Sequence, residues 1–406
     1  MDLLLHPTTL QGSVTPPPSK SESHRLILTA ALAAGESRLR GLAFSDDLRA
    51  TLRGAAALGA SWTEPVPGEL RIRSGAPRLE PIRLDCGASG STLRFMIPLS
   101  LALCGGGDFT GDRRLLARPL EPYLRLFEEH GVEWTREENA LRLRGALRPG
   151  EYRLSGALSS QFFSGLLFAL PLLDGPSRLR WTSPPVSMGY LRMTASVLSG
   201  AGVELRGLED GYEVFPSRPR PLEAEPDRDW SQAAFWIAAR ELGGGLLVLG
   251  LDGNSPQPDR VVMELAERLR RGGDLTLDLS QCPDLLPPLA VIAALRRGSC
   301  RLCGAARLRG KESDRLASVT AALGALGAEI REEADGLWIR GRESLPGGCE
   351  ADSARDHRVA MAVAVAATRC ERPVLLRGAD CVNKSYPDFW DVYQSLGGRF
   401  DAVELG

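Results

Sequence analysis

A repeated pattern of apolar helix, glycine and short strand is the feature that most constrains how this chain can fold. The pattern occurs six times, at Gly59, Gly131, Gly202, Gly273, Gly327 and Gly397. These glycines are separated by 72, 71, 71, 54 and 70 residues, so the period is close to 71 residues and is broken once. Glycine is expected directly after a helix because it adopts the left-handed conformation at little cost. The period predicts six helix-to-strand units in two lobes of three, although helix, glycine and strand also recur in any α/β protein.

Length and charge narrow the class of protein. A chain of 406 residues is too long for one ordinary core and favours two domains of roughly 200 residues each. Its 49 basic and 51 acidic residues are interspersed, which argues against a nucleic-acid or membrane-surface partner. Asp2 stands where a signal peptide needs a cation, and the longest apolar run, residues 96–104, is too short to span a bilayer. We therefore expect a soluble, cytoplasmic protein.

Lysine is rare in this chain, and its positions are informative. Only three of the 49 basic residues are lysines, Lys20, Lys311 and Lys384, and each precedes an apolar, helix-like run. Arginine is a planar fork of donors, whereas lysine is a compact point charge, so the two are not interchangeable at a tight site. The alternative explanation of the low number is a coding bias towards arginine, but under such a bias the same argument holds. The remaining lysines are then the ones hardest to replace, and we expect chemistry near them.

Six predicted helix starts carry polar residues, most of them suited to anions, which a helix N-terminus attracts through its dipole and its N–H groups. They are residues 19–25, 86–94, 159–161, 229–232, 356–358 and 384–388. The Gly/Ser loop at 86–94 lacks the Lys-Ser/Thr ending of a nucleotide P-loop, so ATP binding is not implied. Each cluster by itself is also compatible with a capped surface helix whose charges are solvated.

Two acidic residues are candidates for proton transfer. Glu312 lies in the mixed-charge segment 309–315, directly after Lys311, where a carboxylate could serve bound anions. Asp284 is embedded in apolar sequence, and a buried carboxylate needs a partner. The alternatives are a salt-bridged helix entry for Glu312 and a helix cap for Asp284. Cys300 and Cys303 have the spacing of half a zinc site, but no second pair completes it.

Seven short motifs carry a resemblance to a known family. They are Lys20-Ser21-x-x-x-Arg25, Ser89-Gly90-Ser91-Thr92-Leu93-Arg94, Arg118-Pro119-Leu120, Ser159-Ser160-Gln161, Lys311-Glu312-Ser313-Asp314-Arg315, Asp356-His357-Arg358 and Lys384-Ser385-Tyr386-Pro387. In this order, from Pro18 to about Leu396, they resemble the 5-enolpyruvylshikimate-3-phosphate (EPSP) synthase family of enolpyruvyl transferases. The resemblance implies an α/β fold of two similar lobes, each of three βαβαββ units, with the active site in the interlobe cleft. The first lobe would contain residues 1–18 and 228–406, and the second residues 19–227.

The resemblance also implies an activity and its residues. The enolpyruvyl group of phosphoenolpyruvate would be transferred to the 5-hydroxyl of shikimate-3-phosphate by a monomer that needs no metal or organic cofactor. The catalytic residues would be Asp284 and Glu312 as proton carriers and Lys20. The implied shikimate-3-phosphate ligands are Lys20, Ser21, Arg25, Ser159, Ser160, Gln161, Ser187, Tyr190, Asp284 and Lys311. The implied phosphoenolpyruvate ligands are Lys20, Gly90, Arg118, Gln161, Arg315, Arg358 and Lys384.

Two alternatives remain at this stage. The related transferase that acts on UDP-N-acetylglucosamine typically has Lys-Asn at the first lysine and a cysteine-bearing loop. This chain has Lys20-Ser21 and no cysteine between Gly105 and Arg118. The second alternative is a non-catalytic anion-binding relative. The presence of both Asp284 and Glu312 argues against it.

Overall fold

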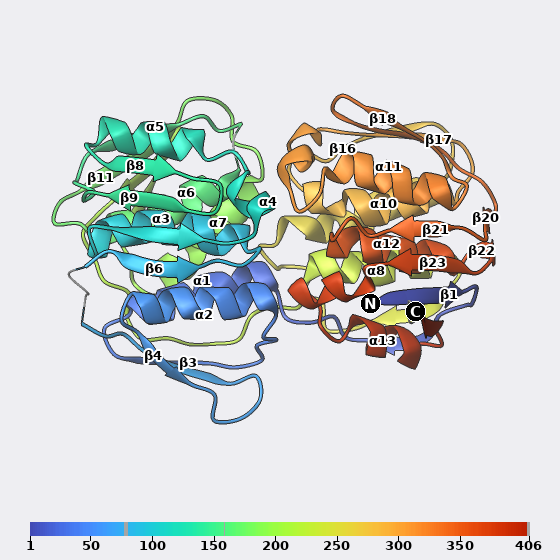
Figure 1. Ribbon diagram of the computed structural model, residues 1–406, viewed down its shortest axis with the longest axis horizontal. Helices are drawn as coiled ribbons and strands as arrows, with labels where there is room; N and C mark the ends of the chain where they lie inside the picture. Colours follow the sequence, from blue (N-terminus) through green and yellow to red (C-terminus); the bar gives the residue numbers. More distant parts are fainter. Residues whose placement is uncertain (77–79, 158, 404–406) are drawn as a thin grey trace. The chain divides into compact units, whose positions relative to one another are not determined.

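The chain forms two compact units in the computed structural model, which describes residues 1–76, 80–157 and 159–403. Unit 1 contains residues 1–17 and 228–406, and unit 2 contains residues 18–227 (Figure 1). Unit 2 is thus one continuous segment inserted into unit 1. Within the described residues, no helix is both long and apolar enough to cross a membrane.

Within its described residues, unit 2 contains three four-stranded sheets that share one topology. In each sheet the first two strands are parallel and the next two are antiparallel, in the orders β14-β3-β5-β4, β6-β7-β9-β8 and β10-β11-β13-β12. The strands are β3 (Glu36–Leu39), β4 (Ser61–Thr63), β5 (Leu70–Arg73), β6 (Ile82–Asp85), β7 (Gly106–Thr110), β8 (Glu133–Arg136), β9 (Leu141–Arg144), β10 (Glu151–Leu154), β11 (Ser177–Trp181), β12 (Leu205–Leu208), β13 (Gly211–Val214) and β14 (Glu223–Ala224). The helices are α1 (Lys20–Leu32), α2 (Asp46–Ala57), α3 (Gly90–Leu103), α4 (Arg113–Leu116), α5 (Glu121–Glu129), α6 (Ser160–Ala169), η1 (Leu170–Leu172) and α7 (Met188–Gly200).

Unit 1 repeats this topology in two sheets, β21-β23-β1-β24 and β16-β17-β19-β18, and adds two parallel pairs, β15-β2 and β20-β22. Its strands are β1 (Asp2–His6), β2 (Gln11–Val14), β15 (Gly245–Val248), β16 (Leu275–Asp278), β17 (Ser299–Cys303), β18 (Glu329–Glu333), β19 (Gly336–Arg340), β20 (Leu345–Gly347), β21 (Glu350–Asp352), β22 (Cys370–Arg372), β23 (Val374–Arg377) and β24 (Arg399–Val403). Its helices are α8 (Trp230–Glu241), η2 (Pro258–Val261), α9 (Val262–Arg270), η3 (Pro283–Leu285), α10 (Leu286–Ala294), η4 (Ala306–Gly310), α11 (Arg315–Ala325), α12 (His357–Ala367), η5 (Ala379–Lys384) and α13 (Phe389–Ser395).

The glycine pattern found in the sequence marks the ends of real helices. All six glycines have positive φ, from 76° at Gly131 to 103° at Gly59, as the left-handed helix ending requires. The short interval of 54 residues also has a structural cause. After α9 the chain continues directly into β16, the first strand in the order of the next sheet. Each of the other five helices leads instead into the last strand in the order of its sheet. Among the described residues, β15 and β2 therefore remain a two-stranded pair.

The N-terminal strand completes a sheet made otherwise from the C-terminal end of the chain. β1 lies between β23 and β24, with Leu3 opposite Leu376 on one side and Ala402 on the other. Leu3 and Leu5 are fully buried. This pairing explains why residues 1–17 belong to unit 1 although unit 2 follows them in the sequence.

Helices that are apolar on all sides form the centre of each unit. In unit 1, α8, α10 and α12 pack against one another, and every residue of α10 and α12 is buried (Figure 1). In unit 2, α3 and α6 pack together in the same way. A helix buried all round is expected to be apolar throughout. Polar side chains are accordingly concentrated at the first turns of these helices and in the loops that precede them.

Candidate functional site

Unit 1 gathers seven charged side chains into one group, which we call the unit 1 charge cluster. The members are Asp284, Lys311, Glu312, Arg315, Asp356, Arg358 and Lys384. They come from η3, the loop between η4 and α11, the starts of α11 and α12, and the end of η5. The structure therefore brings together six sequence-predicted site residues and adds Asp356.

Arg315 is the centre of this cluster. Its guanidinium donates from Nε to Asp356 Oδ2 at 2.9 Å, from Nη1 to Asp284 Oδ1 at 2.9 Å and from Nη2 to Glu312 Oε2 at 2.7 Å. The side chain is only 1% exposed. Interaction with these carboxylates raises the pKa of Arg315 further, against the effect of burial, so it is permanently charged. One planar fork thus fixes the positions of three carboxylates.

Asp284 is held as an anion by surrounding cations. Arg358 Nη2 lies 3.2 Å from its Oδ2, and Lys311 Nζ lies 3.7 Å from its Oδ1. Burial alone raises the pKa of Asp284, but the charges of Arg358 and Lys311 overcome this effect and hold the pKa well below its usual value. The carboxylate keeps 18% of its side chain exposed, so it remains accessible to a proton donor or a hydroxyl group.

Glu312 is the second carboxylate with some exposure, at 14% of its side chain. Its Oε1 lies 3.5 Å from Nζ of Lys384, while its Oε2 is bound by Arg315.

Asp284 raises the pKa of Lys311, whereas burial and the charge of Arg315 lower it, and the net pKa lies below the usual value for lysine. The cluster can therefore hold two accessible carboxylates in fixed positions beside two lysine amines.

Asp356 is the member of the cluster for which the sequence predicts no site role. It is fully buried, accepts from Ser313 Oγ at 3.0 Å, and caps α12 by accepting from the Arg358 backbone N–H at 3.0 Å. The motif Asp356-His357-Arg358 and the cap pattern before an apolar run were visible in the sequence. Its pairing with Arg315, 41 residues earlier, carried no local signal.

Unit 2 contains a second group, which we call the unit 2 polar cluster: Lys20, Asp47, Gly90, Arg94, Arg118 and Gln161. Its two parts meet where Oγ1 of Thr92, in the first turn of α3, lies 3.5 Å from the backbone carbonyl of Asp47. Lys20, at the first position of α1, places Nζ 2.7 Å from Oδ2 of Asp47, which lies in the first turn of α2. Asp47 was also missed in the sequence, where the pattern Ser45-Asp46-Asp47 indicates a helix start but not its basic partner.

Gly90 opens α3 in contact with two arginines. A Cβ atom placed there would lie 2.7 Å from Nη1 of Arg118 and 2.9 Å from Nη1 of Arg94. Arg94 Nη1 also donates to Gln161 Oε1 at 3.1 Å, and Gln161 Nε2 donates to Ser91 Oγ at 2.9 Å. The glycine thus allows guanidinium groups to reach the first turn of α3, an arrangement suited to an anion.

Arg25 is directed towards protein groups in this structure. Its Nε donates to Thr194 Oγ1 at 2.7 Å, its Nη1 to the carbonyl of Ser21 at 2.5 Å and its Nη2 to the carbonyl of Tyr190 at 3.0 Å. The side chain is buried, and burial lowers the pKa of Arg25 to about 10. Direct contact of Arg25 with a ligand stays a prediction, whereas its contacts with the starts of α1 and α7 are observed.

The remaining predicted ligands of unit 2 lie at two helix starts. Ser159 caps α6 by accepting from the Gln161 backbone N–H at 3.4 Å, and Ser160 is buried behind it. Ser187 precedes α7 with φ of 52°, a left-handed conformation that is uncommon for serine, and Tyr190 lies in the first turn of the same helix. Strained residues of this kind are concentrated at functional positions.

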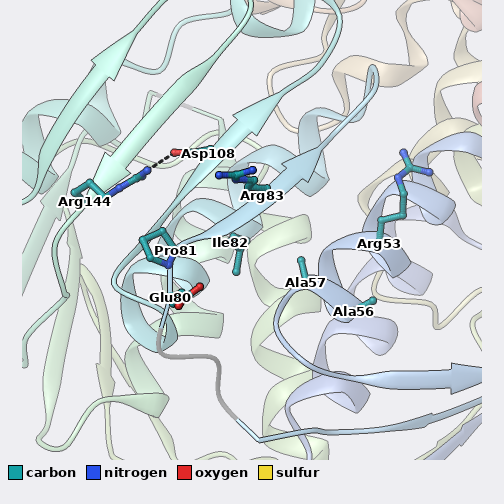
Figure 2. A pocket seen from close by; sticks show the side chains of 9 residues that line it. All are labelled: Arg53, Ala56, Ala57, Glu80, Pro81, Ile82, Arg83, Asp108 and Arg144. Atoms are coloured by element: carbon teal, nitrogen blue, oxygen red, sulfur yellow. Dashed lines mark hydrogen bonds and ion pairs between the residues drawn. The ribbon is translucent and has the colours of Figure 1, made fainter.

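A groove on unit 2 is separate from the two clusters, because its lining residues belong to neither. The groove has a volume of about 1090 Å³ and lies beside α2, β6, β7 and β9 (Figure 2). Its charged residues are Arg53, Glu80, Arg83, Asp108 and Arg144, of which Arg144 donates to Asp108 at 2.6 Å. None of the predicted site residues lines it. Among residues 1–76, 80–157 and 159–403, no group of three or more His, Cys, Asp or Glu side chains could hold a metal ion.

The chain is similar to known proteins over nearly its whole length. Residues 5–393 match the family model described as EPSP synthase (3-phosphoshikimate 1-carboxyvinyltransferase). The chain is 38% identical to the 3-phosphoshikimate 1-carboxyvinyltransferase of Clostridium acetobutylicum, over 99% of both chains. It is 41% identical to the enzyme of the same name from Clostridium perfringens, over 98% of both.

Solved structures show the same fold. The EPSP synthase of Acinetobacter baumannii superimposes with a TM-score of 0.81 at 24% identity, over 99% of this chain and 100% of that one. The enolpyruvyl transferase NikO from Streptomyces tendae gives a TM-score of 0.77 at 18% identity, over 98% of both chains. The predicted two-lobed α/β fold class is thereby confirmed. With its family model matched over nearly the whole length, the chain belongs to the EPSP synthase family.

Proposed function

We propose that this protein transfers the enolpyruvyl group of phosphoenolpyruvate to the 5-hydroxyl of shikimate-3-phosphate and releases inorganic phosphate. The observation that carries the proposal is the unit 1 charge cluster, in which Asp284 and Glu312 are accessible yet fixed by one buried arginine. Two positioned carboxylates suit a reaction in which the hydroxyl loses a proton, C3 gains one and loses it again, and the departing phosphate takes one up. The name shared by the full-length relatives supports the same activity.

The first chemical step is an addition. The oxygen of the 5-hydroxyl forms a bond to C2 of phosphoenolpyruvate and loses its proton, while C3 gains a proton and becomes a methyl group. Asp284 is suited to accept the hydroxyl proton because the charges of Arg358 and Lys311 keep its pKa low and the group ionised. We assign to Glu312 the delivery of the proton to C3, for which Glu312 must be protonated when phosphoenolpyruvate is bound. Lys384, which lies beside its Oε1, is assigned to the phosphate.

The second step is an elimination from the tetrahedral intermediate. The methyl group at C3 loses a proton, the C2–C3 double bond forms again and the bond from C2 to the phosphate oxygen breaks. The departing phosphate takes up the proton that Asp284 accepted from the 5-hydroxyl, so it leaves as inorganic phosphate and Asp284 is ionised again. The carboxylate that delivered the proton to C3 is positioned to take the proton of the methyl group back. Lys20 and Lys384 offset the negative charge that develops on the departing phosphate.

The substrate ligands divide by chemistry. For shikimate-3-phosphate, Ser21, Ser159, Ser160 and Lys311 offer hydroxyl and amine donors to its phosphate and ring hydroxyls. The other ligands proposed for it are Lys20, Arg25, Gln161, Ser187, Tyr190 and Asp284. Arg25 and Tyr190 are joined by the hydrogen bond described above, so Arg25 can also act by positioning the start of α7.

Phosphoenolpyruvate carries a carboxylate and a phosphate. Arginines recognise a planar carboxylate with two parallel hydrogen bonds, and lysines suit a tetrahedral phosphate. We assign the arginine role to Arg118 and Arg358, and the lysine role to Lys20 and Lys384. Gly90, Gln161 and Arg315 complete the proposed set; Arg315 acts on the substrate chiefly through the carboxylates that it holds.

Phosphate release tests this function directly. Purified protein is incubated with phosphoenolpyruvate and one of three additions: shikimate-3-phosphate, UDP-N-acetylglucosamine or no acceptor. We expect phosphate release only with shikimate-3-phosphate. Release with UDP-N-acetylglucosamine would assign the protein to the related transferase reaction, and no release with any acceptor would indicate an anion-binding relative without turnover.

A further inference from the structure

A chain of hydrogen bonds between four buried polar side chains connects three helices of unit 2. Nδ1 of His24 lies 2.7 Å from Oγ1 of Thr51, which lies 2.7 Å from Oγ1 of Thr92, which lies 2.8 Å from Oγ of Ser89. His24 belongs to α1, Thr51 to α2, and Ser89 and Thr92 to the start of α3. We call these four residues the buried polar chain.

The buried polar chain lies directly behind the residues proposed to bind phosphoenolpyruvate. His24 is one helical turn after Lys20 on α1, and Thr51 is one turn after Asp47 on α2, so each pair shares a helix face. Lys20 and Asp47 are themselves joined at 2.7 Å.

The other end of the chain reaches the first turn of α3. Ser89 caps this helix by accepting from the Thr92 backbone N–H at 3.3 Å, and Gly90 lies between these two residues. Oγ1 of Thr92 also lies 3.5 Å from the backbone carbonyl of Asp47. The chain therefore connects the backbone that carries Lys20 and Asp47 with the backbone that carries Gly90.

The four side chains are polar where packing alone would favour apolar ones. Their exposed fractions are 1% for His24, 0% for Thr51, 0% for Thr92 and 1% for Ser89. Burying a hydroxyl or an imidazole costs free energy unless it is hydrogen-bonded, and an apolar side chain of the same shape avoids that cost. A directional set of bonds, in contrast, fixes the spacing between helices to within a narrow range.

We propose that His24, Thr51 and Thr92 are positioning residues that hold Lys20 at a fixed place relative to the start of α3 at Gly90, and so preorganise the phosphoenolpyruvate subsite. The inference rests on the proposed function for its substrate. It assigns these residues no contact with substrate. Lys20 belongs to both proposed ligand sets, whereas Gly90 and Arg118 belong only to the phosphoenolpyruvate set. Loss of the chain should therefore weaken the binding of phosphoenolpyruvate more than the binding of shikimate-3-phosphate.

The test compares Thr51→Val, which removes the hydroxyl and keeps the shape, with Thr51→Ser, which keeps the hydroxyl. Thr29→Val is the matched control. Thr29, on α1, is a buried threonine like Thr51, but its Oγ1 has no hydrogen-bond partner within the described chain. We expect Thr51→Val to raise KM for phosphoenolpyruvate at least fivefold and to change KM for shikimate-3-phosphate less than twofold. Thr51→Ser and Thr29→Val should both stay within twofold of the original protein for both substrates.

Three outcomes would overturn the proposal: an unchanged KM for phosphoenolpyruvate in Thr51→Val, an equal rise for both substrates, or the same change in Thr29→Val. If Thr51→Val does not fold, Thr51→Ala is read by the same criteria, because it adds no new atoms to the core. Calorimetric titration with phosphoenolpyruvate in the absence of any acceptor gives a readout that needs no turnover. Failure of the original protein to release phosphate would contradict the proposed function, whereas equal binding by Thr51→Val and the original protein would contradict only this inference.

Discussion

At the scale of single residues, Arg315 is the group on which the unit 1 charge cluster depends. Its three donor directions are used on Asp356, Asp284 and Glu312 at 2.7–2.9 Å, in a position that water hardly reaches. A buried ion network of this kind is weak evidence for stability in itself, but removing one partner leaves uncompensated charges. The role of Arg315 is therefore tested best by a change that preserves its charge and removes its geometry.

Arg315→Lys should lower both stability and turnover. A lysine ammonium is a point charge and cannot bind three carboxylates in different directions at once. We expect the free energy of unfolding, measured in urea, to fall by about 3 kcal/mol, the lower end of the cost of breaking a buried ion pair. Arg271→Lys is the control, because Arg271 is 74% exposed in its pair with Glu267 and should change stability by less than about 0.5 kcal/mol. Equal effects of the two substitutions would contradict the role of Arg315.

His24 should make stability depend on pH in the acidic range. Burial lowers the pKa of His24 to about 3, while Asp47 raises it and the charges of Lys20 and Arg25 lower it further. The unfolded chain has the ordinary pKa of 6.5, so between pH 6.5 and 3 it binds more protons than the folded chain. The stabilising contribution is therefore complete above pH 6.5 and is lost as the pH falls towards 3.

The measurement is urea unfolding of the original protein and of His24→Gln at pH 7 and pH 4. The original protein should lose more stability between these values, by on the order of 3 kcal/mol, because glutamine has no proton to gain. If the original protein and His24→Gln lose the same free energy of unfolding, the prediction is wrong. The imidazole would then be protonated already in the folded state, or would titrate alike in the folded and unfolded chains.

At the scale of elements, buried helices carry their chemistry in their first turn. α3, α6 and α12 are apolar along their length, and the polar residues stand where unpaired N–H groups need partners and where the helix dipole favours anions. This arrangement lets the same helix serve as core and as ligand site. It also makes the first residue of such a helix sensitive to a single added methyl group.

Gly90→Ala should weaken phosphoenolpyruvate binding with little effect on the fold. The added Cβ would lie 2.7 Å from Nη1 of Arg118 and 2.9 Å from Nη1 of Arg94, so both guanidinium groups must move. These atoms are the far ends of flexible side chains, and the shift costs less than a backbone rearrangement. We expect KM for phosphoenolpyruvate to rise about tenfold, which corresponds to about 1.4 kcal/mol. Gly200→Ala is the control, because its Cβ meets nothing within 4 Å; a tenfold rise there would contradict the argument.

The local elements could largely be predicted from the sequence, whereas long-range pairing could not. The glycine period located helix ends, since positive φ is a local requirement. The motif residues 311, 312 and 315 were near one another by sequence. In contrast, Asp47 and Asp356 find their partners 27 and 41 residues away, and no local pattern encodes such distances. The substrate roles of the individual residues remain predictions.

At the scale of the whole molecule, each unit closes on itself although the chain crosses between units twice. In unit 1, the Asp229 backbone N–H donates to the carbonyl of Pro17 at 2.8 Å, which joins the two segments of that unit. In unit 2, the Ser19 backbone N–H donates to the carbonyl of Asp227 at 2.7 Å, so the first and last residues of that segment are adjacent. Adjacent ends are typical of a domain inserted into another.

Unit 2 should therefore fold by itself, and unit 1 should fold if its two segments are joined. We expect residues 18–227 alone, and residues 1–17 joined to 228–406 by a short glycine-serine linker, each to show one cooperative transition in urea by circular dichroism. Residues 228–406 without residues 1–17 are the control, because β1 is an interior strand between β23 and β24 and carries the fully buried Leu3 and Leu5. Its loss leaves the edges of β23 and β24 unpaired and exposes the core beneath them, so this fragment should unfold without a cooperative transition. A cooperative transition in the control equal to that of the joined unit 1 would show that β1 and β2 are both dispensable. The absence of a cooperative transition in residues 18–227 would show that unit 2 depends on unit 1.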